Sequence, residues 1–302
     1  MKLVLLLLLV YIPSVAQVSS GTLAAEKVFT THKLKRTHLH AHKSLALGPE
    51  LPEGSGLALW NGLLWTHNDS GEAKLFAMDT MSGAIVSEYL LPGIKNNDWE
   101  DLNQDKNFFY IGDFGNNSGK RDIVKVLRVE KASLLANKPI IDSILFAWPE
   151  TMHRGRRQKI NFDCEAMAVI NDTIFLFTKE WKNERCTRVF SLPLLPGTYT
   201  AAYKSTLKTN ILITGASYNE DKNRLVLCGY NLLLRPRLLL FEDATPANLL
   251  TGKGKKIKVR LPFRQVEGVA TDDGTDYYII NEDFKRMFLH SEQQLHKVNL
   301  NK

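Results

Sequence analysis

The sequence lacks the short motifs by which common catalytic centres are recognised. It has no Gly-x-Ser-x-Gly nucleophile elbow, no glycine-rich phosphate loop and no His-Glu-x-x-His metal motif. Its longest apolar run, residues 3–12, is far shorter than the roughly 20 residues that a membrane-spanning helix requires. These absences argue against familiar nucleophilic machinery and predict that the protein has no transmembrane segment.

Cysteine is also scarce, since Cys164, Cys186 and Cys228 are the only three in the sequence. In an oxidising compartment an odd number leaves at least one thiol without a disulfide partner, and no two of the three are spaced as a metal-binding pair. We expect buried, unreactive thiols. A bridge between Cys164 and Cys186 is the alternative, because cysteine connectivity cannot be read from a sequence.

Positive charge is in modest excess, with 39 Lys and Arg against 32 Asp and Glu and a formal net charge of +7. Basic residues cluster within residues 33–36, 154–159 and 253–260. Each cluster can attract phosphate or an anionic surface, and the alternative is that they form solvated loops and edge strands that resist aggregation. No nucleic-acid-binding motif is present, so no nucleic-acid partner is predicted, and the sequence leaves the oligomeric state open.

The N-terminus has the pattern of a secretory signal. Met1 and Lys2 precede the apolar run, and Pro13-Ser14-Val15-Ala16 ends the segment with small residues. We predict that residues 1–16 are a signal peptide and that the product is periplasmic or secreted. No cysteine follows the apolar run, so a bacterial lipid anchor is not expected. Residues 17–37 are then an N-terminal extension, and residues 38–302 are predicted to form a single domain.

A short pattern recurs through this domain: a small or acidic triplet, an apolar run, a turn, a second apolar run and a polar cluster. Its copies begin at Ser55-Gly56-Leu57, Glu100-Asp101-Leu102, Glu165-Ala166-Met167 and Glu267-Gly268-Val269, with a weaker copy at Thr214-Gly215-Ala216. Short apolar runs around turn residues predict antiparallel hairpins, and repetition at this spacing is typical of a β-propeller. We therefore predict an all-β propeller of four-stranded blades, five in number, with six as the alternative.

The last repeat is one strand short when the chain ends. We predict that part of residues 38–47 supplies this strand and closes the ring by pairing the two ends of the domain, which removes an exposed sheet edge. In the third repeat, the predicted fourth strand is residues 200–204.

This architecture also predicts where a site would lie. The first strand of each blade lines the channel, and antiparallel pairing puts its start beside the end of the second strand. Carboxylates would therefore gather at one channel mouth, and the candidate metal ligands are Glu100, Asp101, Glu165, Glu267 and Glu282. Crowded carboxylates need protons, cations or basic partners, and their oxygens suit Ca²⁺. The alternative is that these acids tie the blades together through backbone N–H groups or partners such as Lys179.

Aromatic and polar residues accompany the acids in the same loops. The candidate ligand-binding residues are Trp65, His67, Asn68, Asp69, Trp99, Asp113, Glu180 and Trp181. An aromatic ring beside hydrogen-bonding groups suits a sugar or another small polar ligand, whereas packing between blades is the alternative role of the tryptophans. If the protein is an enzyme, which the sequence leaves open, His67, Glu100 and Glu165 are the candidate catalytic residues.

Several of these segments carry a family resemblance. Glu53-Gly54-Ser55-Gly56-Leu57, Trp65-Thr66-His67-Asn68-Asp69-Ser70-Gly71 and Asp98-Trp99-Glu100-Asp101-Leu102 resemble a group of uncharacterised exported bacterial β-propeller proteins. More distantly, the placing of the acids is similar to that in phytase-like and gluconolactonase-like propellers. That resemblance implies Ca²⁺ held at the channel mouth beside a phosphate or a lactone, although this chain shares no ligand motif with them.

The sequence thus predicts an exported propeller that binds a cation, a small polar or anionic ligand, or both at an acidic channel mouth. A Ca²⁺-dependent hydrolase, of phosphoesterase or lactonase type, and a protein-interaction scaffold are the alternatives.

Overall fold

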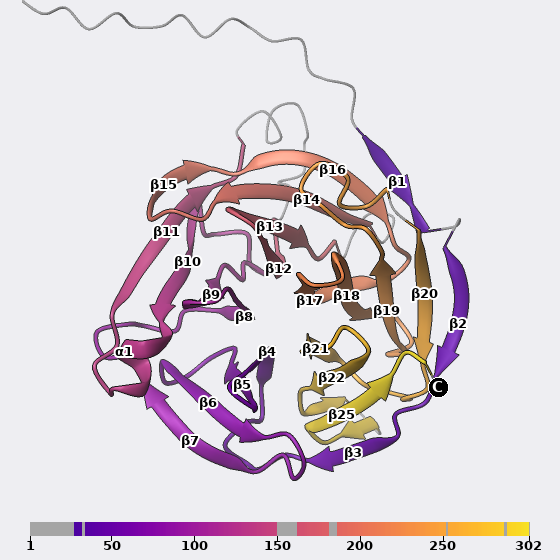
Figure 1. The fold of residues 1–302 in the computed structure, drawn as a ribbon, viewed down its shortest axis with the longest axis horizontal. Coiled ribbons are helices and arrows are strands. Elements are labelled where there is room, and N and C mark those ends of the chain that lie inside the picture. The colour runs from indigo at the N-terminus through magenta and orange to yellow at the C-terminus, as the bar shows by residue number, and fades with distance from the viewer. Residues whose placement is uncertain are drawn as a thin grey trace, which may run out of the picture.

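The sequence repeats form five small sheets that stand around a common axis in the computed structural model (Figure 1). The structure describes residues 27–31, 34–149, 162–180, 186–251, 253–286 and 289–301. The predicted signal peptide, basic residues 154–159 and Trp181 lie outside these ranges. The prediction of an all-β propeller is confirmed, with five blades and not six.

The blades are numbered here in chain order. Blade 1 contains β4 (Gly54–Trp60), β5 (Leu63–Asn68), β6 (Lys74–Asp79) and β7 (Ile85–Leu90). Blade 2 contains β8 (Trp99–Gln104), β9 (Phe108–Asp113), β10 (Ile123–Glu130) and β11 (Ile141–Ala147), with helix α1 (Lys131–Leu135) before β11. Blade 3 contains β12 (Cys164–Ile170), β13 (Thr173–Thr178), β14 (Cys186–Pro193) and β16 (Ala202–Lys208). Blade 4 contains β17 (Leu212–Asn219), β18 (Arg224–Tyr230), β19 (Pro236–Phe241) and β20 (Gly254–Val259).

Blade 5 is built from both ends of the domain. It contains β21 (Val266–Thr271), β22 (Asp276–Asn281), β25 (Gln294–Asn299) and the N-terminal strand β3 (Lys43–Ala46). β3 pairs antiparallel with β25, from Lys43 opposite Lys297 to Ala46 opposite Gln294. The predicted closing strand is therefore confirmed, and the edge that blade 5 would otherwise expose is paired.

Three outer strands were not expected from the sequence. β1 (Val28–Thr30) pairs parallel with β16, β2 (Lys35–Leu39) with β20, and β15 (Gly197–Thr200) with β11. β15 joins blade 2 although its neighbours in sequence belong to blade 3. The prediction of a fourth strand at residues 200–204 is therefore partly wrong, because that strand starts at Ala202 and continues to Lys208. A further hairpin, β23 (Phe284–Arg286) with β24 (Leu289–Ser291), stands between β22 and β25.

The hydrophobic core consists of layers between neighbouring blades. In β6, Leu75 and Ala77 pack with the aromatic and aliphatic residues of blade 2, whereas Phe76 and Met78 pack with those of blade 5. Side chains alternate across a strand, so a sheet covered on both faces needs an uninterrupted apolar run. The continuous runs of the repeat are explained by this double burial. Helix α1 is short, and no helix in the described ranges is long and apolar enough to cross a membrane.

No disulfide is present within the described residues. Cys164, Cys186 and Cys228 are all buried thiols, and burial is the first reason that the pKa values of Cys164 and Cys228 lie well above that of a free thiol. They occupy blade interiors as small apolar side chains.

Every inner strand has an irregularity of register near its start. The shifts fall between Ser55 and Ala58, Trp99 and Asp101, Cys164 and Ala166, Ile213 and Gly215, and Val266 and Gly268. In blades 2, 3 and 5 the residue left unpaired is a glutamate: Glu100, Glu165 or Glu267. A β-bulge changes the direction in which the side chain of its extra residue points. The three bulged glutamates are the residues from which the candidate site is described below.

The close approach of the inner strands explains the small residues of the repeat. A Cβ at Gly268 would lie 2.8 Å from the carbonyl carbon of Gly56, and one at Gly56 would lie 2.2 Å from the backbone nitrogen of Leu102. Inner strands of blades 5, 1 and 2 therefore approach to near backbone contact, which only a residue without a side chain permits. The recurring small residue is thus a requirement of the ring itself.

Candidate functional site

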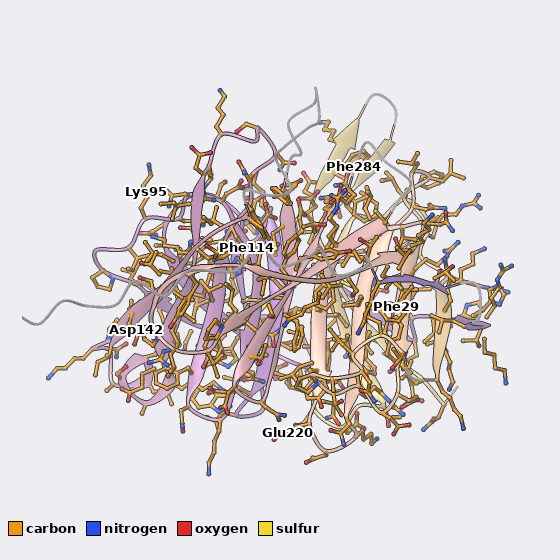
Figure 2. All side chains as sticks on the ribbon, turned by 90° about the horizontal axis from the view of Figure 1, so that it is seen from above. Phe29, Lys95, Phe114, Asp142, Glu220 and Phe284 are labelled. Atoms are coloured by element: carbon orange, nitrogen blue, oxygen red, sulfur yellow. The ribbon has the colours of Figure 1, made fainter. Side chains whose placement is uncertain are left out.

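The bulged glutamates lie at the side of the ring where the first strands start. Figure 2 shows the ring edge-on, with Lys95, which precedes β8, and Phe284, which follows β22, on one side and Glu220 on the other. The starts of the inner strands and the ends of the second strands share the side of Lys95 and Phe284. This side is called the channel mouth below.

Three carboxyl groups meet at the mouth between blades 2 and 3. Glu100, Asp163 and Glu165 are buried, and each offers one oxygen such that all three atoms lie within 4.8 Å of one another. Oδ1 of Asp163 accepts the backbone N–H of Asn116 at 3.1 Å. Oδ2 of Asp163 is buried and has no hydrogen-bond partner in the described part of the chain. This oxygen is the feature of the cluster that needs explanation, because a buried polar atom without a partner destabilises the fold.

Lys179 brings a positive charge into this cluster. Nζ of Lys179 lies 2.7 Å from Oε2 of Glu165, and both side chains are buried. The ammonium also lies 5.8 Å from the ring centroid of Tyr230. Burial opposes the charge of Lys179, but the carboxyl groups of Glu165 and Glu267 raise its pKa well above the usual range. Lys179 therefore stays protonated and neutralises one of several carboxyl groups.

The carboxyl groups of the cluster are hard to ionise together. Burial is the main cause that raises the pKa of Asp163 and of Glu165 to about 7, with Glu165 adding to the effect on Asp163. Burial and then the charge of Glu165 raise the pKa of Glu100 well above its ordinary value. Protonation of Asp163 or Glu165 relieves part of this repulsion.

A second acidic group continues the mouth across blades 5 and 1. Burial raises the pKa of Glu267 to about 8 and that of Glu282 to about 7. Burial and the neighbouring Glu53 raise that of Asp69 to about 8. Nε2 of Gln265 donates to Glu282 at 2.5 Å. The charge of Glu282 raises the pKa of Glu267, and the charges of Asp69 and Glu165 raise that of Glu282, so the acids around the mouth interact with one another.

Three other predicted acids have hydrogen-bond or ion-pair partners in the fold. Oδ2 of Asp101 accepts the backbone N–H of Met167 in blade 3 at 2.7 Å, and its Oδ1 accepts that of Leu102 at 2.9 Å. Asp113 pairs with Arg121 at 2.6 Å and Lys125 at 3.5 Å, and it also accepts Nδ2 of Asn97 at 2.8 Å. Glu180 accepts the hydroxyl of Thr178 at 3.0 Å and pairs with Arg188. These acids hold blades and strand ends together.

The predicted aromatic residues are placed differently from the acids. Trp65 and Trp99 are buried between blades 1 and 2, where Trp65 contacts Phe109 with ring centroids 4.9 Å apart. His67 is buried against the edge of Trp99, 5.3 Å between centroids, and its Nδ1 lies 3.0 Å from the carbonyl of Asn68. Burial lowers the pKa of His67 to about 4, so this ring is neutral at physiological pH. Trp181 lies outside the described residues.

Asn68 forms the edge of the mouth near blade 1. Its Nδ2 donates to the carbonyl of Glu50 at 2.8 Å, and its Oδ1 accepts the backbone N–H of Glu53 at 3.2 Å. Both halves of the amide thus hold the loop that precedes β4. The carboxyl groups of Asp69 and Glu53 are brought together by this loop.

Sequence reasoning missed Asp163 and Asp98 as neighbours of the bulged glutamates. A signal was available, because Asp98 and Asp163 each stand two residues before a bulged glutamate, Glu100 and Glu165, in consecutive blades. Gly115 packs directly against the first pair, since a Cβ there would lie 2.2 Å from Oε1 of Glu100 and 2.5 Å from Oδ2 of Asp98. This glycine leaves the space that the two carboxyl groups occupy.

The chain matches no protein-family model and no curated protein. Solved structures with some similarity are propellers or contain them. A chain of the mitotic checkpoint complex aligns with 9% identity and a TM-score of 0.43, covering 86% of this chain and 95% of that one. The RRP9 WD40 repeats align with 9% identity and a TM-score of 0.39, covering 82% and 67%. Apo AztD from Citrobacter koseri aligns with 10% identity and a TM-score of 0.39, covering 82% and 71%.

Proposed function

We propose that this protein is an exported β-propeller that binds a divalent cation, Ca²⁺ foremost, on Glu100, Asp163 and Glu165 at the channel mouth. The observation that carries the proposal is Oδ2 of Asp163, a buried oxygen without a hydrogen-bond partner among the described residues, in a group of three carboxyl oxygens within 4.8 Å of one another. A cation between the three would satisfy this oxygen and offset their mutual repulsion.

The donor set fits a hard cation. Ca²⁺ binds oxygen ligands at about 2.3–2.6 Å, so two ligands on opposite sides of the ion stand about 5 Å apart. The 4.8 Å span of the three oxygens is compatible with that size. Mg²⁺, at about 2.0–2.1 Å, would require the same side chains to close further. Lys179 occupies one oxygen of Glu165 and leaves the group with a net negative charge.

A small polar or anionic ligand would complete the coordination from the channel. Three side chains do not fill the six to eight positions that Ca²⁺ takes, so solvent or ligand oxygens are expected in the remaining positions. The ammonium of Lys179 contacts Glu165 and lies near the ring of Tyr230. Both groups would favour an oxyanion beside the ion. Export is supported by the N-terminal pattern of residues 1–16.

A Ca²⁺-dependent hydrolase is the second candidate, and one observation favours it. The pKa of Glu165 is raised to about 7, which is the range expected of a general base that works at neutral pH. His67 is less suited to this task, because its ring is buried and its pKa is lowered to about 4. Binding without turnover is our first choice, since Lys179 already engages the Glu165 carboxylate.

The test is calorimetric titration of metal-free protein with CaCl₂, with a thermal melt in calcium and in chelator. We expect binding and a higher melting temperature in calcium, because a ligand that binds only the native state stabilises it. Asp163→Asn should remove both effects. Asp142→Asn is the matched control, because its carboxylate pairs with Arg128 away from the mouth.

Retention of calcium stabilisation in Asp163→Asn would contradict the proposal, as would the absence of any calcium effect on the wild type. A panel of phosphate esters and lactones then separates the two candidates. Turnover that is lost in Glu165→Gln would establish catalysis. A mouth that binds a protein partner in chelator as well as in calcium would favour the scaffold alternative.

A further inference from the structure

Two neighbouring loops on the mouth side of blades 4 and 5 expose large apolar side chains. Leu232 and Leu233, between β18 and β19, are 58% and 59% exposed, and Phe263, between β20 and β21, is 48% exposed. The backbone N–H of Arg264 donates to the carbonyl of Leu234 at 3.0 Å and joins the two loops. The side chains of Leu232, Leu233 and Phe263 are called the apolar rim below. Clustered exposed apolar side chains of this size mark interaction surfaces.

The loops that carry the apolar rim are held in a defined shape. Oδ1 of Asn231 accepts the backbone N–H groups of Leu233 at 3.1 Å and Arg235 at 3.0 Å. Leu234 and Phe263 have φ values of 52° and 56°, in the left-handed region that side chains of this size rarely occupy. Such strain persists where the surrounding contacts impose it, and it is frequent at binding sites. The exposed apolar side chains are therefore carried by loops of defined conformation.

A basic hollow adjoins the rim. A cavity of about 270 Å³ is lined by Arg235, Lys258, Val259, Arg260, Leu261 and Pro262. Three of its six lining residues are cations and none is an acid. Arg235 belongs to the loop of Leu232 and Leu233, and Pro262 precedes Phe263, so the hollow connects the two parts of the rim.

The cations around this hollow are not neutralised by the protein. Among the described residues, Arg235, Arg237, Lys258 and Arg260 form no ion pair with a carboxylate. Burial and then the charge of Arg235 lower the pKa of Arg237, which indicates that like charges are crowded here. A surface that concentrates unpaired cations attracts anions from solution or from a membrane.

We propose that the apolar rim and the basic hollow dock the protein onto an anionic lipid bilayer, with a lipid phosphate in the hollow and Leu232, Leu233 and Phe263 in the headgroup region. Apolar side chains at loop tips beside cations are the combination that interfacial membrane binding uses: apolar burial and attraction to anionic lipids add together. A protein partner would need matching acids, whereas an anionic bilayer offers negative charge and an apolar layer at once. This charge complementarity favours an anionic bilayer over a protein partner.

The experiment is cosedimentation of the full chain with vesicles of phosphatidylglycerol and phosphatidylcholine, compared with vesicles of phosphatidylcholine alone. We expect binding to the first kind only, weakened by 0.5 M NaCl. Leu232→Ser with Leu233→Ser, and separately Arg235→Gln with Arg260→Gln, should each lower the affinity at least roughly tenfold. All four side chains are exposed, so thermal melts should show folded variants.

Matched controls come from the opposite side of the ring. Leu195→Ser removes an apolar side chain that is 66% exposed, and Lys106→Gln with Lys138→Gln removes two exposed cations. These variants should bind vesicles as the wild type does. Equal binding by the rim variants, equal loss in the controls or equal binding to both vesicle types would overturn the proposal. So would full competition by millimolar inorganic phosphate, because the hollow would then be a site for a free anion.

Discussion

Two groups of carboxylates lie at the starts of first strands and the ends of second strands but differ in their surroundings. Asp113 and Glu180 pair with arginines, and Asp101 accepts two backbone N–H groups that partly offset the burial that raises its pKa. Glu100, Asp163 and Glu165, by contrast, form a buried cluster whose negative charge is partly neutralised by Lys179. The recurrence of an acid therefore indicates only its position in a blade. Its partners determine whether it stabilises the ring or contributes to a site.

The largest effect should come from removing Lys179, the cation that pairs with Glu165 in the mouth cluster. Lys179→Met leaves Glu165 buried without its partner, and we expect a loss of about 3–5 kcal/mol in the free energy of unfolding of metal-free protein. Urea denaturation at pH 8 measures it. Calcium should restore part of the loss, because the ion replaces the missing positive charge.

Lys125→Met is the control for this change. Lys125 is the more distant of two cations beside Asp113, at 3.5 Å, and it is partly exposed. Its removal should change the free energy of unfolding by no more than about 1 kcal/mol. Equal losses in the two variants would mean that the two groups of carboxylates do not differ as described.

A smaller effect is expected from the structural group. Asp101→Ala leaves the buried N–H groups of Met167 and Leu102 without acceptors, which should destabilise the protein by about 2–3 kcal/mol in urea denaturation. Asp101→Asn keeps an amide oxygen as acceptor and should lose less. Calcium affinity, measured by calorimetry, should be little changed in Asp101→Asn. If this variant binds calcium as poorly as Asp163→Asn, Asp101 belongs with the site and not with the ring.

The smallest effect, counted per carboxyl group and per pH unit, is the pH dependence of stability in metal-free protein. The pKa values of Asp163 and Glu165 are raised to about 7 and that of Glu267 to about 8, so the folded state holds protons that the unfolded state releases near pH 4. Stability should therefore fall as the pH rises from about 5 to about 8, by at most about 1.4 kcal/mol per pH unit for each group. Lys179 remains protonated throughout this window.

Thermal melts across this pH range, with and without calcium, measure the slope. Calcium should flatten it, since an ion that binds the ionised carboxylates competes with protons. Asp163→Asn in chelator should also show a weaker slope than the wild type. Stability that rises with pH in metal-free wild type would contradict the assigned carboxyl groups.

Much of the fold could be read from the sequence because its signals are local. Apolar runs around turns, such as Leu102 to Ile111, predicted hairpins, and the missing strand of the last repeat predicted closure by part of residues 38–47. The outer strands β1, β2 and β15 had no such signal. Each pairs in parallel with the edge strand of a blade that is distant in sequence. Such pairing depends on the path of the chain across the ring, which no local sequence pattern encodes.

The site was predictable in outline only. The repeat indicated that Glu100, Glu165 and Glu267 would gather at one mouth, and they do so because each is the extra residue of a bulge; their role as ligands stays a prediction. The unpartnered oxygen of Asp163 could not be foreseen, since it depends on Asn116 of blade 2 occupying the other oxygen. The compensation of Asp113 likewise depends on Arg121 folding back across its own loop.

The pairing of β3 with β25 also has a consequence for the order of assembly. The two strands are separated by nearly the whole domain in sequence, so blade 5 cannot be completed before β25 has been synthesised. Contacts of such long range slow the final step of folding. The ring therefore stays an open arc until β25 meets β3 and joins the two ends of the domain.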